Sequence, residues 1–121
     1  MIKPLTALAL MATSATAQGV RDSDTRLSAD ETRAKLAEQV VEFFDGSKAR
    51  YGGDGAYAYT YTDDGPAFRG TYVANDGGEV CVGFDNGFDR CDTYVLSGDR
   101  LVLIIADGTR FPARSVTPLA D

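Results

Sequence analysis

The chain has 121 residues, 18 of them acidic and 12 basic, so its formal net charge is −6. This length favours a single domain with one modest hydrophobic core. Nucleic acids and anionic membranes bind clustered lysines and arginines, and the scattered basic residues of this acidic chain argue against both as partners. The chain has no histidine. That excludes Ser-His and Cys-His nucleophiles and leaves too few soft ligands for a zinc site.

The first 17 residues predict a secretory signal peptide. Lys3 supplies a positive start, an apolar run follows at 5–11, and Ala15-Thr16-Ala17 fits a small-x-small cleavage site. The run is shorter than the ~20 apolar residues that a membrane-spanning helix needs, so we expect no membrane span. We therefore expect cleavage after Ala17 and export to the periplasm or the extracellular space. Residues 18–27 are polar and predict a flexible leader, and 28–121 form one domain.

The segment 28–46 has the pattern of an amphipathic helix of about four turns. Ser28 and Glu31 form a capping box, and Gly46 stands where a helix-ending glycine belongs. Apolar side chains share one helical face at spacings of four, seven and eight residues, namely Leu36, Val40, Phe43 and Phe44. This apolar face requires a partner surface, and we expect a sheet to provide it.

Short β-rich runs separated by glycine-containing turns follow the predicted helix. They lie at 56–62, 67–74, 79–84, 88–96, 100–106 and 109–116, with 48–52 as a further short strand. Connections this short join antiparallel neighbours. The sequence therefore predicts an α+β domain: an N-terminal amphipathic helix packed on a curled antiparallel β-meander of six to seven strands. The pattern leaves open whether the sheet closes into a barrel.

The only two cysteines, Cys81 and Cys91, lie in a predicted hairpin. If residues 85–87 form a three-residue loop with glycine in its last position, Phe84 faces Phe88. Counting inward then puts Cys81 opposite Cys91 in a closely spaced pair without hydrogen bonds. This spacing is compatible with a disulfide, which an oxidising compartment would preserve.

Other chemistry for this segment has less support. Its side-chain oxygens could suit calcium, and they belong to Asp85, Asn86, Asp89 and Asp92. The ligand spacing of an EF-hand is absent, and aspartate beside glycine is ordinary turn chemistry. The cysteine spacing differs from the C-x-x-C of redox enzymes. We therefore expect no metal, no cofactor and no enzymatic activity. A small carboxylate-dependent hydrolase is the weaker alternative, because 18 acidic residues offer many pairs.

A stripe of tyrosines is the most distinctive surface that the sequence predicts. Tyr57, Tyr59 and Tyr61 alternate along one side of their strand, and Phe68 and Tyr72 belong to the neighbouring one. Aromatic rings with a polar tip suit contacts with a ligand or a partner protein. The alternative is that these rings form the core beneath the helix or inside a curled sheet. Solvent exposure would distinguish the two interpretations.

The segments Gly70-Thr71-Tyr72-Val73, DGGEVCV, RC, GDRLVLI and DGTRFP together resemble a group of small secreted alphaproteobacterial proteins called DUF995. The resemblance covers about half of the chain after the signal peptide, and that group often has tryptophan where this chain has Tyr72. It implies an exported antiparallel β domain with a disulfide, and it implies no activity.

Together these features predict an exported, non-catalytic binding or inhibitor-like protein of a Gram-negative bacterium. Its partner would be an unidentified protein or a small ligand. A structural protein associated with the cell envelope, without a specific ligand, is the alternative of a different class.

Overall fold

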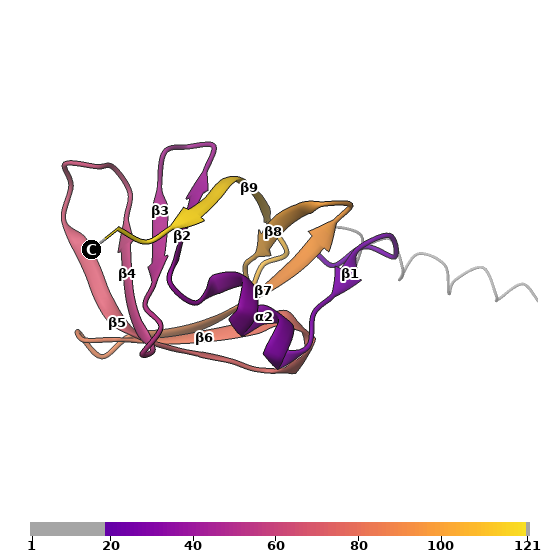
Figure 1. The fold of residues 1–121 in the computed structure, drawn as a ribbon, viewed down its shortest axis with the longest axis horizontal. Helices are drawn as coiled ribbons and strands as arrows, with labels where there is room; N and C mark the ends of the chain where they lie inside the picture. The colour runs from indigo at the N-terminus through magenta and orange to yellow at the C-terminus, as the bar shows by residue number, and fades with distance from the viewer. Residues whose placement is uncertain (1–18, 121) are drawn as a thin grey trace, which may run out of the picture.

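The computed structural model describes residues 19–120, so the predicted signal peptide lies outside the described residues. Within these residues, one short helix and nine strands follow one another (Figure 1). They are β1 Thr25–Arg26, α2 Ala29–Leu36, β2 Gln39–Phe43, β3 Lys48–Tyr51, β4 Ala56–Thr60, β5 Ala67–Ala74, β6 Glu79–Phe84, β7 Asp89–Ser97, β8 Arg100–Ile104 and β9 Arg110–Pro118. A short 3-10 turn, η1 Asp76–Gly78, joins β5 to β6.

Strands β2 to β9 form a closed antiparallel barrel. Each strand pairs with the next one along the chain, and β2 pairs with β9 to complete the ring. Closure removes both sheet edges, which an open meander would leave exposed. The predicted α+β architecture is therefore wrong: residues 19–120 are mostly β, with one short helix. The predicted strands from 48 onward are all present. The prediction of the fold class fails at the helix expected for 28–46.

The helix predicted for 28–46 ends at Leu36, and its second half is strand β2. The capping box is confirmed, since Ser28 and Glu31 each accept a hydrogen bond from the other's backbone amide. Glu38 has a φ of 61°, which interrupts the helical path. Beyond it, Val41 and Phe43 alternate into the barrel and are buried. Strand β2 pairs with β3 along one edge and with β9 along the other. This pairing stabilises the segment as a strand, although its apolar residues also fit the spacing of a helix.

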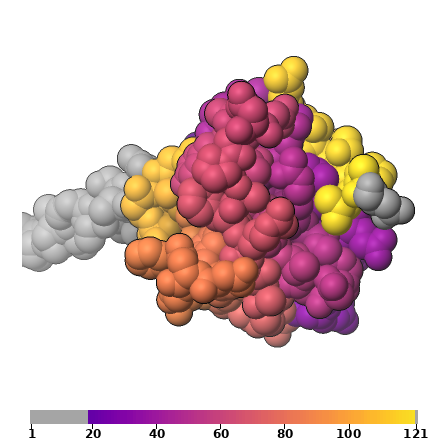
Figure 2. Space-filling model, turned by 90° about the vertical axis from the view of Figure 1, so that its left-hand side faces the viewer, coloured from indigo at the N-terminus to yellow at the C-terminus, as the bar shows by residue number. Residues whose placement is uncertain are grey.

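Helix α2 covers one end of the barrel (Figure 1). Its Leu36 is fully buried in the same core cluster as Leu27, which precedes the helix. The helix also contacts η1, because the Ala29 amide donates a hydrogen bond to Asp76 Oδ1 at 3.1 Å. The turns β3–β4, β5–β6 and β7–β8 lie at this closed end, and the four other strand connections lie at the opposite end. In Figure 2 three of those connections neighbour one another, β4–β5 in pink, β6–β7 in orange and β8–β9 in amber.

Residues 19–27, for which the sequence predicts a flexible leader, lie along the outer wall in the structure. Strand β1 pairs with β7. Val20 packs on an outward-facing cluster formed by Val95, Val102 and Ile104. Arg110 donates hydrogen bonds to both carboxylate oxygens of Asp24, at 2.7 and 3.0 Å. The Asp24 side chain has no exposed surface, so this ion pair ties the segment to β9.

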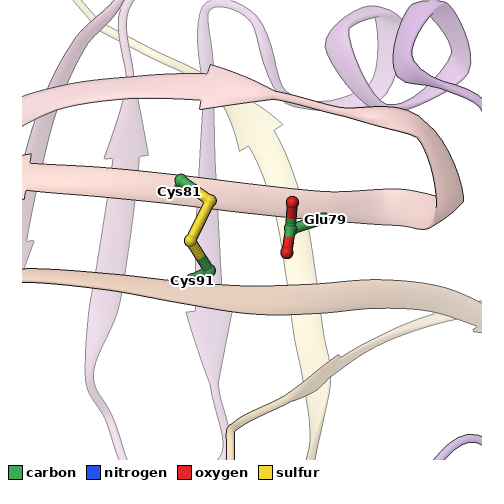
Figure 3. A group of neighbouring side chains, drawn as sticks. All are labelled: Glu79, Cys81 and Cys91. Atoms are coloured by element: carbon green, nitrogen blue, oxygen red, sulfur yellow. A yellow bond between two sulfur atoms is a disulfide. The ribbon is translucent and has the colours of Figure 1, made fainter.

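The predicted disulfide between Cys81 and Cys91 is confirmed (Figure 3). The two residues are register partners in β6 and β7, with Cα atoms 4.0 Å apart. The predicted loop is also present: the Phe84 amide donates to the Phe88 carbonyl at 2.8 Å, and Gly87 has a φ of 97°. A carboxylate oxygen of Glu79 lies within 4.8 Å of both sulfurs. Because the sulfurs are bonded to each other, neither can bind a metal as a thiolate.

Candidate functional site in the barrel interior

A cavity of about 570 Å³ occupies the barrel between its core and the open end. Every aromatic side chain of the protein except those of Phe44 and Tyr72 lines it. The rings come from β2, β3, β4, β5, β6, β7 and β9 and the adjoining turns, because alternation along each strand turns every second side chain inward. An eight-stranded barrel is just wide enough to be filled by side chains or to hold one small ligand.

Four of the five residues predicted as a ligand or partner surface line this cavity, namely Tyr57, Tyr59, Tyr61 and Phe68. Their strands are neighbours, with Tyr59 directly opposite Phe68 in the register. The fifth, Tyr72, lies toward the closed end, is 9% exposed and donates its hydroxyl hydrogen to the Gly52 carbonyl at 2.8 Å. Tyr72 therefore belongs to the core, whereas the other four surround space that a ligand can enter.

Neighbouring rings near the open end are almost perpendicular to each other. The ring centroids of Tyr59 and Tyr61 are 5.0 Å apart with an interplanar angle of 86°. Tyr61 and Phe68 are 5.9 Å apart at 80°. We call these three residues the mouth cage. Edge-to-face packing is a favourable arrangement for aromatic pairs, and it holds the three rings together on the cavity lining.

Deeper in the barrel, Phe84 packs edge-to-face on Tyr57 with their centroids 5.8 Å apart. Gly70 lies opposite Phe84 in the register, and a Cβ atom on it would overlap the carbonyl oxygen of Gly83. Glycine at this position therefore allows β5 and β6 to approach closely beside the aromatic wall.

A charged pair also faces the cavity. Asp92 Oδ2 accepts a hydrogen bond from Arg90 Nε at 2.9 Å, and Arg90 Nη2 lies 2.9 Å from the same oxygen as an ion pair. The Asp92 side chain is 13% exposed and that of Arg90 is 48% exposed. Burial raises the pKa of the Tyr57 hydroxyl, and the positive charge of Arg90 opposes that rise. Tyr57 consequently stays protonated and can donate a hydrogen bond inside the cavity.

The inner limit of the cavity is a pair of fully buried tyrosines. The hydroxyl oxygens of Tyr51 and Tyr94 are 2.7 Å apart and form a hydrogen bond. Burial raises the pKa of both hydroxyls, so both remain neutral at physiological pH. Each of the two buried hydroxyls thereby has a hydrogen-bond partner in otherwise apolar surroundings.

The rim of the cavity is acidic. Asp45, in the β2–β3 turn, accepts hydrogen bonds from the Ser47 amide at 2.9 Å and from the Ser47 hydroxyl at 2.6 Å. The hydroxyl contact, followed by the amide contact, lowers the pKa of Asp45 and keeps it ionised. Burial raises the pKa of Tyr59, and the charge of Asp45 adds to that rise. Tyr59 pairs with Ala49 of β3, and Asp45 lies in the turn that precedes β3, so both line the cavity on the same side of the barrel. Asp89 is a further exposed acid on the lining.

Several residues of the cavity lining are not among those that the sequence predicts as a ligand or partner surface. They are Phe43, Phe84, Phe88, Arg90, Asp92, Tyr94 and Phe111. The predicted disulfide register contained a signal for two of them. Because Cys81 and Cys91 share one face of the hairpin, Arg90 and Asp92 must lie on the opposite face. The disulfide is on the outside of the barrel, so those two side chains face inward.

No family model, curated protein or solved structure matches this chain. The resemblance to the secreted DUF995 group therefore stays a prediction. Within residues 19–120, the one helix is far too short and polar to cross a bilayer. The disulfide is compatible with an oxidising compartment outside the cytoplasm.

Proposed function

We propose that this protein is an exported, non-catalytic binding protein that holds a small, largely apolar ligand inside its barrel. The cavity of about 570 Å³ lined by aromatic rings carries this proposal. Small-molecule sites typically are concave, mostly apolar, 300–1,000 Å³ in volume and supplied with a few polar groups. Arg90, Asp92 and the Tyr57 hydroxyl are among the polar groups of this cavity.

The arrangement of the acids favours binding over carboxylate-based hydrolysis. Asp92 is already paired with Arg90, and Asp45 is engaged by Ser47. A glycosidase-type mechanism needs two carboxyl groups on either side of one scissile bond, one of them protonated. The lowered pKa of Asp45 works against its use as a general acid.

The predicted signal peptide and the disulfide favour a role in the periplasm or outside the cell. The disulfide joins two strands that carry cavity residues, so oxidation would stabilise the binding site itself. A structural envelope protein without a ligand is the alternative, and it would give the aromatic cavity no binding role.

The test is a fluorescence titration of the mature chain, residues 18–121, with N-phenyl-1-naphthylamine, an uncharged dye that brightens in apolar surroundings. We expect saturable binding to one site. Phe88 lines the cavity and is 72% exposed, so F88A should weaken binding with little loss of stability.

The matched control for F88A is F44A. Phe44 is 60% exposed and lies outside the cavity lining, so its removal should leave dye binding unchanged. Absence of saturable dye binding, or equal effects of the two substitutions, would contradict the proposal and favour the envelope alternative.

A further inference from the structure

The charges that face the cavity are unequally available to a ligand. Among the described residues, Arg90 is the only basic one that lines the cavity. Its hydrogen bond from Nε and its ion-pair contact from Nη2 both end on the same Asp92 oxygen, Oδ2. Its positive charge is therefore balanced within the wall. An anionic ligand would have to compete with Asp92 for Arg90, and it would lose its hydration on entering.

The remaining charges favour a cation. Asp45 and Asp89 give the rim two negative charges, and the whole chain has a net charge of −6. A cavity lined by one sign of charge concentrates ions of the opposite sign near its entrance. The same potential repels carboxylates, sulfonates and phosphates.

The mouth cage supplies a second attraction for cations. The face of an aromatic ring carries partial negative charge, and ammonium groups bind over such faces, most strongly where several rings surround them. Tyr59, Tyr61 and Phe68 all line the cavity as successive, nearly perpendicular rings. Tyr59 pairs with Ala49 of β3, and Asp45 lies in the turn that precedes β3 and also lines the cavity. Aromatic and ionic attraction for a cation therefore come from the same side of the cavity.

We propose that the cavity binds organic cations: an ammonium group, quaternary or methylated, carried on an apolar body. The ammonium group lies in the mouth cage beside Asp45, and the apolar body extends inward along the ring of Tyr57. This inference rests on the proposed function, which it makes specific for one chemical class of ligand.

Three probes of similar shape test the charge preference. Benzyltrimethylammonium is the cation, neopentylbenzene is its uncharged isostere, and benzylsulfonate is an anion. Ligand-observed NMR titrations of the mature chain measure all three affinities without the dye. We expect the cation to bind most tightly and the anion most weakly.

Substitutions then test the location. Y61L and F68L keep apolar volume but remove the ring, and each should weaken binding of the cation by about two- to thirty-fold while affecting the isostere less. D45N removes the charge but keeps an oxygen that can accept hydrogen bonds from Ser47. It should therefore weaken binding of the cation and leave binding of the uncharged isostere unchanged. The control is D85N, which removes an exposed acid of the β6–β7 turn that lies outside the lining.

The outcomes separate the two proposals. If the dye or the isostere binds but the cation binds no more tightly than the isostere, the cation inference is wrong and the binding function stands. Equal effects of D45N and D85N on the cation would likewise overturn the location beside Asp45. If neither the dye nor any of the three probes binds, both proposals fail.

Discussion

At the scale of single residues, the hydrogen bond between Tyr51 and Tyr94 shows how the barrel admits polar atoms to its interior. Each ring contributes apolar area to the core, and each hydroxyl is satisfied only by the other among the described residues. Removing one hydroxyl would leave its partner buried without a hydrogen bond, which costs more than the net contribution of the bond itself.

We therefore predict that Y51F and Y94F each lower the free energy of unfolding by about 1–3 kcal/mol. The double variant Y51F/Y94F should lose clearly less than the sum of the two, since it leaves no unpaired hydroxyl. Urea unfolding of the three variants and the parent measures this coupling. Y61F is the control, because Tyr61 is 62% exposed. Additive losses would show that the hydroxyls act independently.

At the scale of elements, three hairpins at the open end share one turn pattern. The segments are Phe43–Ser47, Phe84–Phe88 and Ile105–Thr109. In each, the first residue's amide donates to the last residue's carbonyl, and the third loop residue is a glycine with φ between 90° and 97°. This is the geometry of a three-residue hairpin loop.

This shared pattern explains what the sequence could and could not predict. The turn at 84–88 was recognised, and with it came the correct register and the disulfide. For the equivalent turn at 43–47 the sequence predicts the end of a helix, because Leu36, Val40 and Phe43 also fit a helical face. Comparing the turns would have revealed β2, and β2 is the strand that closes the barrel. The helical spacing of these residues hides strand β2 from prediction. Without β2 the sequence predicts neither the closed barrel nor the cavity inside it.

The ion pair between Asp24 and Arg110 belongs to the same scale, since it joins the N-terminal segment to β9. Hydrogen bonding to Arg110 lowers the pKa of Asp24 below its ordinary value. A carboxyl group with a depressed folded-state pKa contributes stability above its unfolded pKa of about 3.9, and that contribution is lost as the pH falls through the folded value.

We predict that D24N is less stable than the parent at pH 7 and that the difference shrinks as the pH is lowered from about 5 toward 2. Urea unfolding at a series of pH values measures both profiles. D22N is the matched control, because Asp22 is an exposed acid of the same segment. A D24N profile that runs parallel to the parent across this range would show that the ion pair contributes no pH-dependent stability.

At the scale of the whole molecule, the two ends of the barrel differ in composition and in what they contribute. The closed end contains α2, Leu27 and the fully buried Leu36, and it supplies packing. The open end contains the mouth cage, the acidic rim and exposed rings such as Phe88. Such a division allows the rim to carry exposed aromatic surface, because the opposite end provides stability that the rim does not.

This division predicts that stability and ligand binding can be changed separately. L36A removes a fully buried side chain that lies outside the cavity lining, and it should lower the free energy of unfolding by about 2–5 kcal/mol. The dye affinity of the folded L36A protein should match that of the parent. Saturating dye, at about a hundred times its Kd, should then stabilise parent and L36A equally, by about 2.7 kcal/mol.

F88A provides the opposite case, with near-parental stability and a smaller gain from the same dye concentration. Urea unfolding with and without dye measures all four quantities. If L36A reduced the dye affinity as strongly as F88A does, the closed end would also shape the binding site. The barrel would then respond to its ligand as one coupled unit, since a change in packing under α2 would be transmitted along the strands to the mouth.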